Sequence, residues 1–135
     1  MRKIENITEF RIRYVHTDQM GIVYYGNYAM LYEIGRTELM RSIGIAYRDL
    51  EESGIMMPVI EMKSKYKRPL YYDEVIQIKT VIDTLPTASI IFRHEIFNSK
   101  GELCNLGEVT LGFINKVNKR PTRVPSKLLE LLNRG

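Results

Sequence analysis

Residues 14–38 read YVHTDQMGIVYYGNYAMLYEIGRTE, and this stretch joins a predicted strand to the longest predicted helix. Its second half continues into a pattern near i, i+3, i+4 and i+7, which predicts one buried helix face. That face comprises Tyr28, Leu31, Tyr32, Gly35, Leu39 and Ile43. Asn27 suits the N-cap, and Gly44 suits the position just past the C-terminal end. Glycine inside a helix costs about 1 kcal/mol relative to alanine, so we expect a sheet to approach the helix closely at Gly35.

The segments on either side of this helix alternate with period two, which is typical of strands with one buried face. Before the helix, Phe10, Ile12 and Tyr14 share one face of a predicted strand, and the same alternation predicts an inward-pointing His16. After the helix, strands are predicted at residues 58–66, 76–83, 90–96 and 103–114. Two shorter helices are predicted, one at residues 46–53 and one opening at Pro125-Ser126.

The order of elements is therefore strand, long helix, short helix, four strands and a terminal helix. The turn Asn98-Ser99-Lys100-Gly101 is of hairpin length, and such links require antiparallel pairing. We predict an α+β fold in which a five-stranded antiparallel sheet wraps around one long helix, as a single domain over residues 1–135. A single sheet on one helix leaves its outer face and edges uncovered, so we also expect the chain to associate with copies of itself.

The composition is that of a globular protein, with 44% hydrophobic and 27% charged residues. A single cysteine, Cys104, excludes an intrachain disulfide and favours a reducing compartment. The N-terminus lacks a signal-peptide pattern, and no apolar run reaches the length of a membrane span. We therefore expect a cytoplasmic protein without a transmembrane segment.

The net charge of +4 suits an anionic membrane face, nucleic acid or a small molecule that carries phosphates. The densest basic stretch comprises Lys63, Lys65, Lys67 and Arg68. A solvated strand face and a phosphate-binding surface are both open interpretations of this stretch. From the charge alone, each of these three kinds of partner stays open.

Asp18 is the residue with the strongest case for chemistry. It lies in a loop with Gly21, about nine residues before the long helix. A helix N-terminus offers free backbone N–H groups and partial positive charge, which stabilise a developing oxyanion. A carboxylate beside it can act as a base or as a nucleophile, and Gly26 would let a ligand approach the backbone closely. A loop aspartate is also a common turn residue, so both interpretations stay open.

The other candidate side chains favour structural roles. His94 lies on the apolar face of its strand, and Cys104 fits a buried thiol. Glu33 borders the apolar helix stripe and is the weaker acidic candidate. The sequence contains no metal-ligand spacing, no G-x-S-x-G elbow, no phosphate-binding loop and no dinucleotide fingerprint.

The stretch quoted above resembles the 4-hydroxybenzoyl-CoA thioesterase-like branch of the hotdog superfamily. The matching residues are Arg13-Tyr14, Thr17-Asp18, Met20-Gly21-Ile22-Val23-Tyr24-Tyr25, Asn27-Tyr28 and Gly35-Arg36-Thr37-Glu38. Weaker matches continue at Pro58-Val59-Ile60, Tyr66, Pro69 and Asp73. The element order extends the resemblance over essentially the whole chain.

This resemblance implies a hotdog fold, a homodimer or homotetramer, and hydrolysis of an acyl-CoA to a free acid and CoA. It implies catalytic roles for Asp18, as base or nucleophile, and for Tyr25, whose backbone N–H polarises the thioester carbonyl. Gly26 and Asn27 at the helix start, with Lys65, Lys67 and Arg68, are the expected substrate-binding residues. The resemblance implies no metal, no organic cofactor and no nucleic-acid partner. In this family the site lies at the dimer interface.

Two other functions stay open from the sequence. A thioesterase that acts on acyl carrier protein would use a basic surface equally well, because its partner is acidic. A non-catalytic hotdog protein would bind acyl-CoA without turnover. The intact Asp18 loop argues against the second, because a pure binder of an anionic ligand has no use for a carboxylate beside it.

Overall fold

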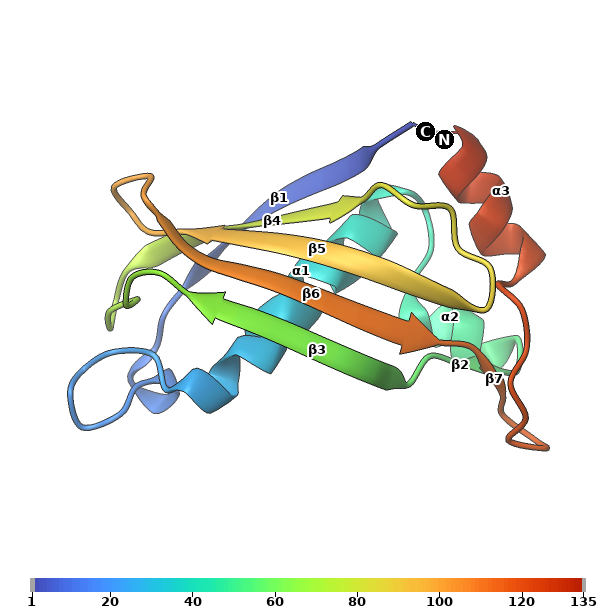
Figure 1. Cartoon of the computed structure of the whole chain (residues 1–135), viewed down its shortest axis with the longest axis horizontal. Helices are drawn as coiled ribbons and strands as arrows, with labels where there is room; N and C mark the ends of the chain where they lie inside the picture. Colours follow the sequence, from blue (N-terminus) through green and yellow to red (C-terminus); the bar gives the residue numbers. More distant parts are fainter. Residues whose placement is uncertain (1, 135) are drawn as a thin grey trace.

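A long helix lies across one face of an antiparallel sheet in the computed structural model, which describes residues 2–134 (Figure 1). The sheet order is β1-β4-β5-β6-β3, and every neighbouring pair is antiparallel. The strands are β1 (Ile4–Arg11), β4 (Val75–Ile82), β5 (Ser89–Phe97), β6 (Leu103–Gly112) and β3 (Val59–Tyr66). The helix is α1 (Tyr28–Ser42). The predicted α+β arrangement of five antiparallel strands around one helix is confirmed.

The smaller elements lie together at one end of this sheet, at the right in Figure 1. They are α2 (Tyr47–Glu52), the two-residue pair β2 (Ile55–Met56) and β7 (Ile114–Asn115), and α3 (Ser126–Arg134). The predicted last strand therefore ends at Gly112, and its final residues pair with β2 instead. The prediction of one domain over residues 1–135 stays a prediction, since Met1 and Gly135 lie outside the described residues.

The α1 helix buries the face that its sequence periodicity predicts. Tyr28, Leu31, Tyr32, Gly35 and Leu39 are all buried. Asn27 occupies the N-cap position but makes no side-chain capping bond. Gly44 follows the helix in the left-handed region, with φ of 100°, and its N–H donates to the carbonyl of Arg41. The chain thus leaves the helix through a residue whose missing Cβ tolerates that backbone conformation.

The predicted close approach at Gly35 is confirmed. A Cβ at Gly35 would lie 2.8 Å from Cγ2 of Ile78 and 3.3 Å from Nδ1 of His94, and it would also overlap the hydroxyl of Thr80. A second glycine faces the helix from β6, because a Cβ at Gly107 would overlap the ring of Tyr32. The helix and the sheet therefore meet where each lacks a side chain.

A buried polar cluster joins α1 to the sheet beside these glycines. The Tyr32 hydroxyl donates to Oδ1 of Asn105 and shares a 2.6 Å hydrogen bond with Ser64. Asn105 Nδ2 donates to Ser64 and to the carbonyl of Lys65, at 3.0 and 3.1 Å. Burial raises the pKa of Tyr32. The helix is thereby bonded directly to β6 and to the edge strand β3.

His94 is a core residue, as its strand position predicts. It is 1% exposed, stacks on Tyr32 with ring centroids 4.8 Å apart, and lies 3.0 Å from the Thr80 hydroxyl. Burial, helped by the nearby positive charge of Arg36, lowers the pKa of His94 to about 3. Cys104 is likewise buried as a free thiol.

The first strand differs from its prediction. It begins at Ile4, earlier than expected, and it ends at Arg11, so the predicted strand face is wrong beyond Ile12. The amide of Ile12 donates to Glu74, after which the chain leaves the sheet and forms a 3₁₀ turn at Tyr14–His16. Tyr14 is therefore exposed and His16 only half-buried, with its Nδ1 accepting the Arg13 amide. A short alternating pattern does not reveal where pairing with β4 stops.

Replacing Gly35 with alanine tests the close approach. Better helix propensity should add about 1 kcal/mol, but the clash with Ile78 and Thr80 is of the kind that costs about 1–3 kcal/mol. We expect a net loss of unfolding free energy, measured by urea denaturation. The exposed Arg41→Ala, as a control on the same helix, should change stability by less than about 0.5 kcal/mol. A more stable Gly35→Ala protein would contradict the packing described above.

The buried His94 predicts a dependence of stability on pH. Its folded pKa is lowered, so between pH of about 6.5 and 3 the unfolded chain binds a proton that the folded chain does not. The free energy of unfolding that the neutral His94 contributes is complete above that pH window. It is lost as the pH falls through the window, at up to about 1.4 kcal/mol per pH unit. Urea unfolding across this range should show a shallower slope for His94→Gln than for wild type.

Candidate functional site

The Asp18 loop is a tight reversal held by its own backbone. Thr17 and Val23 form an antiparallel bridge, the Asp18 amide donates to Ile22, and the Gly21 amide donates to the Asp18 carbonyl. Gly21 adopts φ of 75°, where glycine carries no steric cost. Oδ1 of Asp18 accepts the Met20 amide at 2.8 Å. Its second carboxylate oxygen makes no hydrogen bond within residues 2–134. Asp18 is therefore a turn residue with one carboxylate oxygen available to contact a ligand.

The entrance to α1 presents free backbone donors. A 3₁₀ turn at Tyr25–Asn27 leads directly into the helix. Within it the Asn27 amide donates to Tyr24 and the Tyr28 amide donates to Tyr25. The amides of Tyr25 and Gly26 find no acceptor in the described part of the chain. These two N–H groups at the positive end of the helix are suited to hold an oxygen that gains negative charge.

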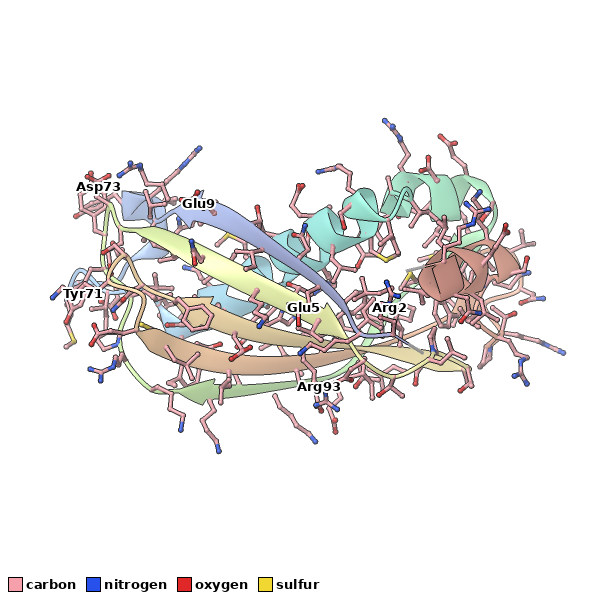
Figure 2. All side chains as sticks on the ribbon, turned by 90° about the horizontal axis from the view of Figure 1, so that it is seen from above. Arg2, Glu5, Glu9, Tyr71, Asp73 and Arg93 are labelled. Atoms are coloured by element: carbon pink, nitrogen blue, oxygen red, sulfur yellow. The ribbon has the colours of Figure 1, made fainter. Side chains whose placement is uncertain are left out.

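One carbonyl holds the loop against the helix entrance. The His16 carbonyl accepts the Tyr24 amide at 3.0 Å and Nδ2 of Asn27 at 2.9 Å. On its other side the loop is held by the link between β3 and β4, where Ile22 bridges to Tyr71. In Figure 2, Tyr71 and Asp73 mark this end of the sheet. The loop and the helix entrance are therefore one connected unit.

A cavity of about 340 Å³ lies between this unit and the end of β3. Its lining consists of Asp18, Ile22, Val23, Tyr25, Tyr28, Tyr66, Lys67, Arg68 and Pro69. Tyr28 and Tyr66 meet edge to face with centroids 4.9 Å apart, and burial raises the pKa of Tyr28 well above its ordinary value. The cavity thus combines a carboxylate, an aromatic wall and two basic side chains.

The structure brings some predicted site residues together and separates others. Asp18, Tyr25, Lys67 and Arg68 line the same cavity. Gly26 and Asn27 lie next to it at the helix entrance, where the Asn27 side chain turns to the His16 carbonyl. Lys65 lines a different hollow, on the outer face of the sheet. The roles predicted for all of these residues stay predictions.

The basic stretch divides because β3 ends at Tyr66, so Lys63 and Lys65 lie within the strand and the later basic residues lie beyond it. Lys63 and Lys65 point outward, where Lys63 lies 3.7 Å from Glu108. This outer face carries paired charges, including Arg93 with Asp83 and Lys79 with Glu5. Glu5 and Arg93 lie away from the end that Tyr71 marks (Figure 2). Lys67 and Arg68 instead follow the end of β3, where their amides donate to the Cys104 carbonyl.

Sequence reasoning missed the aromatic wall of the cavity. Tyr28 was predicted only as a buried helix residue and Tyr66 only as a strand residue. They are 38 positions apart, and no local pattern indicates that they meet. Residues 2–134 contain no group of three or more His, Cys, Asp or Glu side chains placed to hold a metal ion. None of the described helices is long and apolar enough to cross a membrane.

Comparison with known proteins gives a consistent set of relatives. Residues 12–132 match the model of the thioesterase-like superfamily. The putative acyl-CoA thioesterase YneP of Bacillus subtilis is 40% identical over 95 residues, which is 70% of this chain and 69% of that protein. The acyl-CoA thioester hydrolase YbgC of Escherichia coli is 28% identical over 119 residues, 88% of this chain and 89% of that one.

A solved structure is similar over nearly the whole chain. The DHNA-CoA thioesterase from Staphylococcus aureus superposes with a TM-score of 0.92 at 33% identity. The match covers 96% of this chain and 89% of the other.

Replacing Asn27 with alanine tests the link between loop and helix. Loss of the hydrogen bond from Asn27 to the His16 carbonyl should lower the free energy needed to open the loop by about 1 kcal/mol. We expect amide hydrogen exchange at residues 17–24 to accelerate by about fivefold to tenfold. Gln19→Ala, in the same loop, should leave the exchange unchanged, because the Gln19 side chain makes no hydrogen bond within residues 2–134. Unchanged exchange in Asn27→Ala would show that the loop is held without this bond.

Proposed function

The chain belongs to the thioesterase-like superfamily and is a hotdog-fold thioester hydrolase, and we propose that it converts an acyl-CoA to a free acid and CoA at the Asp18 cavity. Asp18 acts as general base or nucleophile, and the Tyr25 amide polarises the carbonyl. One observation carries this proposal. A carboxylate with a free oxygen shares a cavity with a helix entrance that has two unused N–H donors.

The chemistry requires these two parts together. As the thioester carbonyl is attacked, its oxygen gains negative charge. Donors fixed at that position stabilise it, and the loss of one typically costs about 3 kcal/mol. The amides of Tyr25 and Gly26 are rigid because the helix holds them, so they need no reorganisation during the reaction.

Two routes fit this geometry. In the first, the Asp18 carboxylate takes a proton from water and the hydroxide attacks the carbonyl carbon. The C–S bond then breaks, and the proton held by Asp18 passes to the leaving thiolate to release CoA. In the second, an Asp18 oxygen attacks the carbonyl carbon directly, CoA leaves as its thiolate, and water hydrolyses the resulting mixed anhydride. Both routes give the free acid and CoA and leave the Asp18 carboxylate unchanged.

The basic residues at the cavity suit the phosphates of CoA. Lys67 and Arg68 line it beside Asp18. Arg68 lies 3.5 Å from Glu102, whereas Lys67 forms no ion pair within residues 2–134. Both side chains extend from the exposed end of β3, so they can meet a phosphate without the cost of burying charge. We expect them to lower KM more than they raise kcat.

We also infer that the chain works as a homodimer or as a tetramer built from such dimers. Strand β3 is an unpaired edge, and it exposes Val59, Ile60 and Met62. An exposed edge with apolar side chains is normally covered. Antiparallel pairing of β3 with its own copy, through a two-fold axis, would cover the β3 edge of each protomer.

We place the reaction in the cytoplasm, as the single reduced cysteine favours.

Asp18→Asn is the central test. It retains the side-chain oxygen that accepts the Met20 amide but removes the base and nucleophile. We expect kcat/KM for an acyl-CoA to fall by at least about 100-fold, measured by release of free thiol, while the unfolding free energy changes little. Asp73→Asn is a matched control. Asp73 is an exposed carboxylate at the same end of the sheet, paired with Arg11, and asparagine tolerates its φ of 69°.

Wild-type turnover by a folded Asp18→Asn protein would contradict the proposed mechanism. Parallel assays with one acyl group carried by CoA and by acyl carrier protein decide the carrier. Lys67 and Arg68 line the cavity itself, where they can contact the phosphates of a small ligand. We therefore expect a higher kcat/KM for the acyl group on CoA than for the same group on the carrier protein.

A further inference from the structure

A second cavity, of about 320 Å³, lies toward the C-terminal half of α1, away from the Asp18 loop. Its lining consists of Glu33, Arg36, Tyr47, Leu50, Glu51, Ile55, Met57 and Leu111. Four of these side chains are aliphatic or thioether groups, which suit an apolar ligand. The other four are polar or charged, so the cavity also has a defined polar side.

Arg36 is buried at this cavity without a partner. It is 8% exposed, and its Nε is fully buried and makes no hydrogen bond. The Arg36 side chain forms no ion pair with any residue from 2 to 134, and its positive charge lies close enough to Tyr47 to act on that hydroxyl. A buried donor without an acceptor typically costs about 1–3 kcal/mol. Such an unsatisfied donor in a native cavity indicates a ligand that supplies an oxygen.

The hydroxyl of Tyr47 is a second unused group in the same place. It is buried and has no hydrogen-bond partner among the described residues. Burial raises the pKa of Tyr47 to about 12, so the hydroxyl keeps its proton at neutral pH and can donate it. Arg36 and Tyr47 therefore offer donors to the same ligand from α1 and from α2.

The carboxylates at this cavity decide the charge of that ligand. Glu33 and Glu51 also line it, and both are exposed. Their two negative charges outnumber the single positive charge of Arg36, so an anionic ligand would meet net repulsion. A hydroxyl or keto oxygen on an apolar body satisfies the donors without that cost.

The two cavities lie at opposite ends of β3. Tyr66, the last residue of β3, lines the Asp18 cavity, whereas Met57, just before the strand, lines the second cavity. Figure 1 shows the start of α1 near the end of β3 and α2 near its beginning. If β3 pairs antiparallel with its copy, the end of one strand lies beside the beginning of the other. The Asp18 cavity of one protomer then faces the second cavity of its partner.

Resting on the proposed function and its dimer, we propose that the Arg36–Tyr47 cavity of one protomer receives the distal end of the acyl group held at Asp18 of the other. Arg36 and Tyr47 select acyl groups that carry an uncharged hydroxyl or keto oxygen far from the thioester. They determine specificity and do not touch the reacting carbonyl.

Matched substrates test this selection. We would compare aliphatic acyl-CoAs of several lengths with their ω-hydroxy and ω-keto analogues, ω-carboxy analogues, and benzoyl-CoA with its hydroxy isomers. For at least one pair, wild type should prefer the oxygen-bearing member by about tenfold or more in kcat/KM. It should not prefer the carboxylate. Tyr47→Phe removes one oxygen atom and should reduce the preference several-fold, measured as the ratio of kcat/KM within each matched pair.

Tyr72→Phe is the control, because it removes a hydroxyl from an exposed tyrosine outside both cavities. Arg36→Met should weaken the preference further if that protein folds, but Tyr47→Phe alone decides the question. Equal rates across every matched pair in wild type would overturn this inference and leave the proposed hydrolysis standing. Absence of hydrolysis on every acyl-CoA, while Asp18→Asn and wild type behave alike, would overturn the proposed function as well.

A mixed dimer tests which protomer supplies the cavity. One chain carries Asp18→Asn and the other carries Tyr47→Phe, and differently tagged copies are purified as the hybrid. The only intact Asp18 then faces the intact Tyr47 of the other chain, so we expect the hybrid to keep the wild-type preference. Loss of the preference would place both groups in one chain, and a monomeric wild type in sedimentation equilibrium would likewise overturn the shared arrangement.

Discussion

The arrangement of the molecule depends on a close contact between helix and sheet that two missing side chains permit. Gly35 on α1 meets Thr80 and Ile78, and Gly107 on β6 lies beneath the ring of Tyr32. Any Cβ at either position would separate the two layers. Because the layers touch there, the Tyr32 hydroxyl reaches Asn105 and Ser64, and van der Waals contact is supplemented by buried hydrogen bonds.

This contact also positions the site. The α1 helix is held at its middle, so its entrance lies where β3 ends, and Tyr28 packs against Tyr66. The Asp18 loop is bonded to that entrance through the His16 carbonyl. The carboxylate, the helix amides and the basic residues are thus brought together by one rigid helix, although they come from three separate segments. A site built this way loses little entropy when the substrate binds.

The same helix connects two cavities of different character. One is lined by the Asp18 carboxylate and two basic side chains beside the helix entrance. The other has Arg36 and Tyr47 without partners in an otherwise apolar lining. Neither is large enough to enclose a whole acyl-CoA, and the unpaired edge of β3 lies between their ends. A two-fold copy of the chain is the simplest way to combine them.

The sequence by itself determined most of the elements and the α+β class, and it singled out the segment from Asp18 to Tyr25 as the candidate site, because periodicity and turn residues are local properties. It also indicated that Gly35 needs a close neighbour. Only the tertiary structure decided which neighbour that is, that Lys67 joins Asp18 while Lys65 points away, and that His16 leaves the strand face. Those outcomes depend on strand register and on contacts between residues far apart in the chain, such as Tyr28 with Tyr66, which no local pattern encodes.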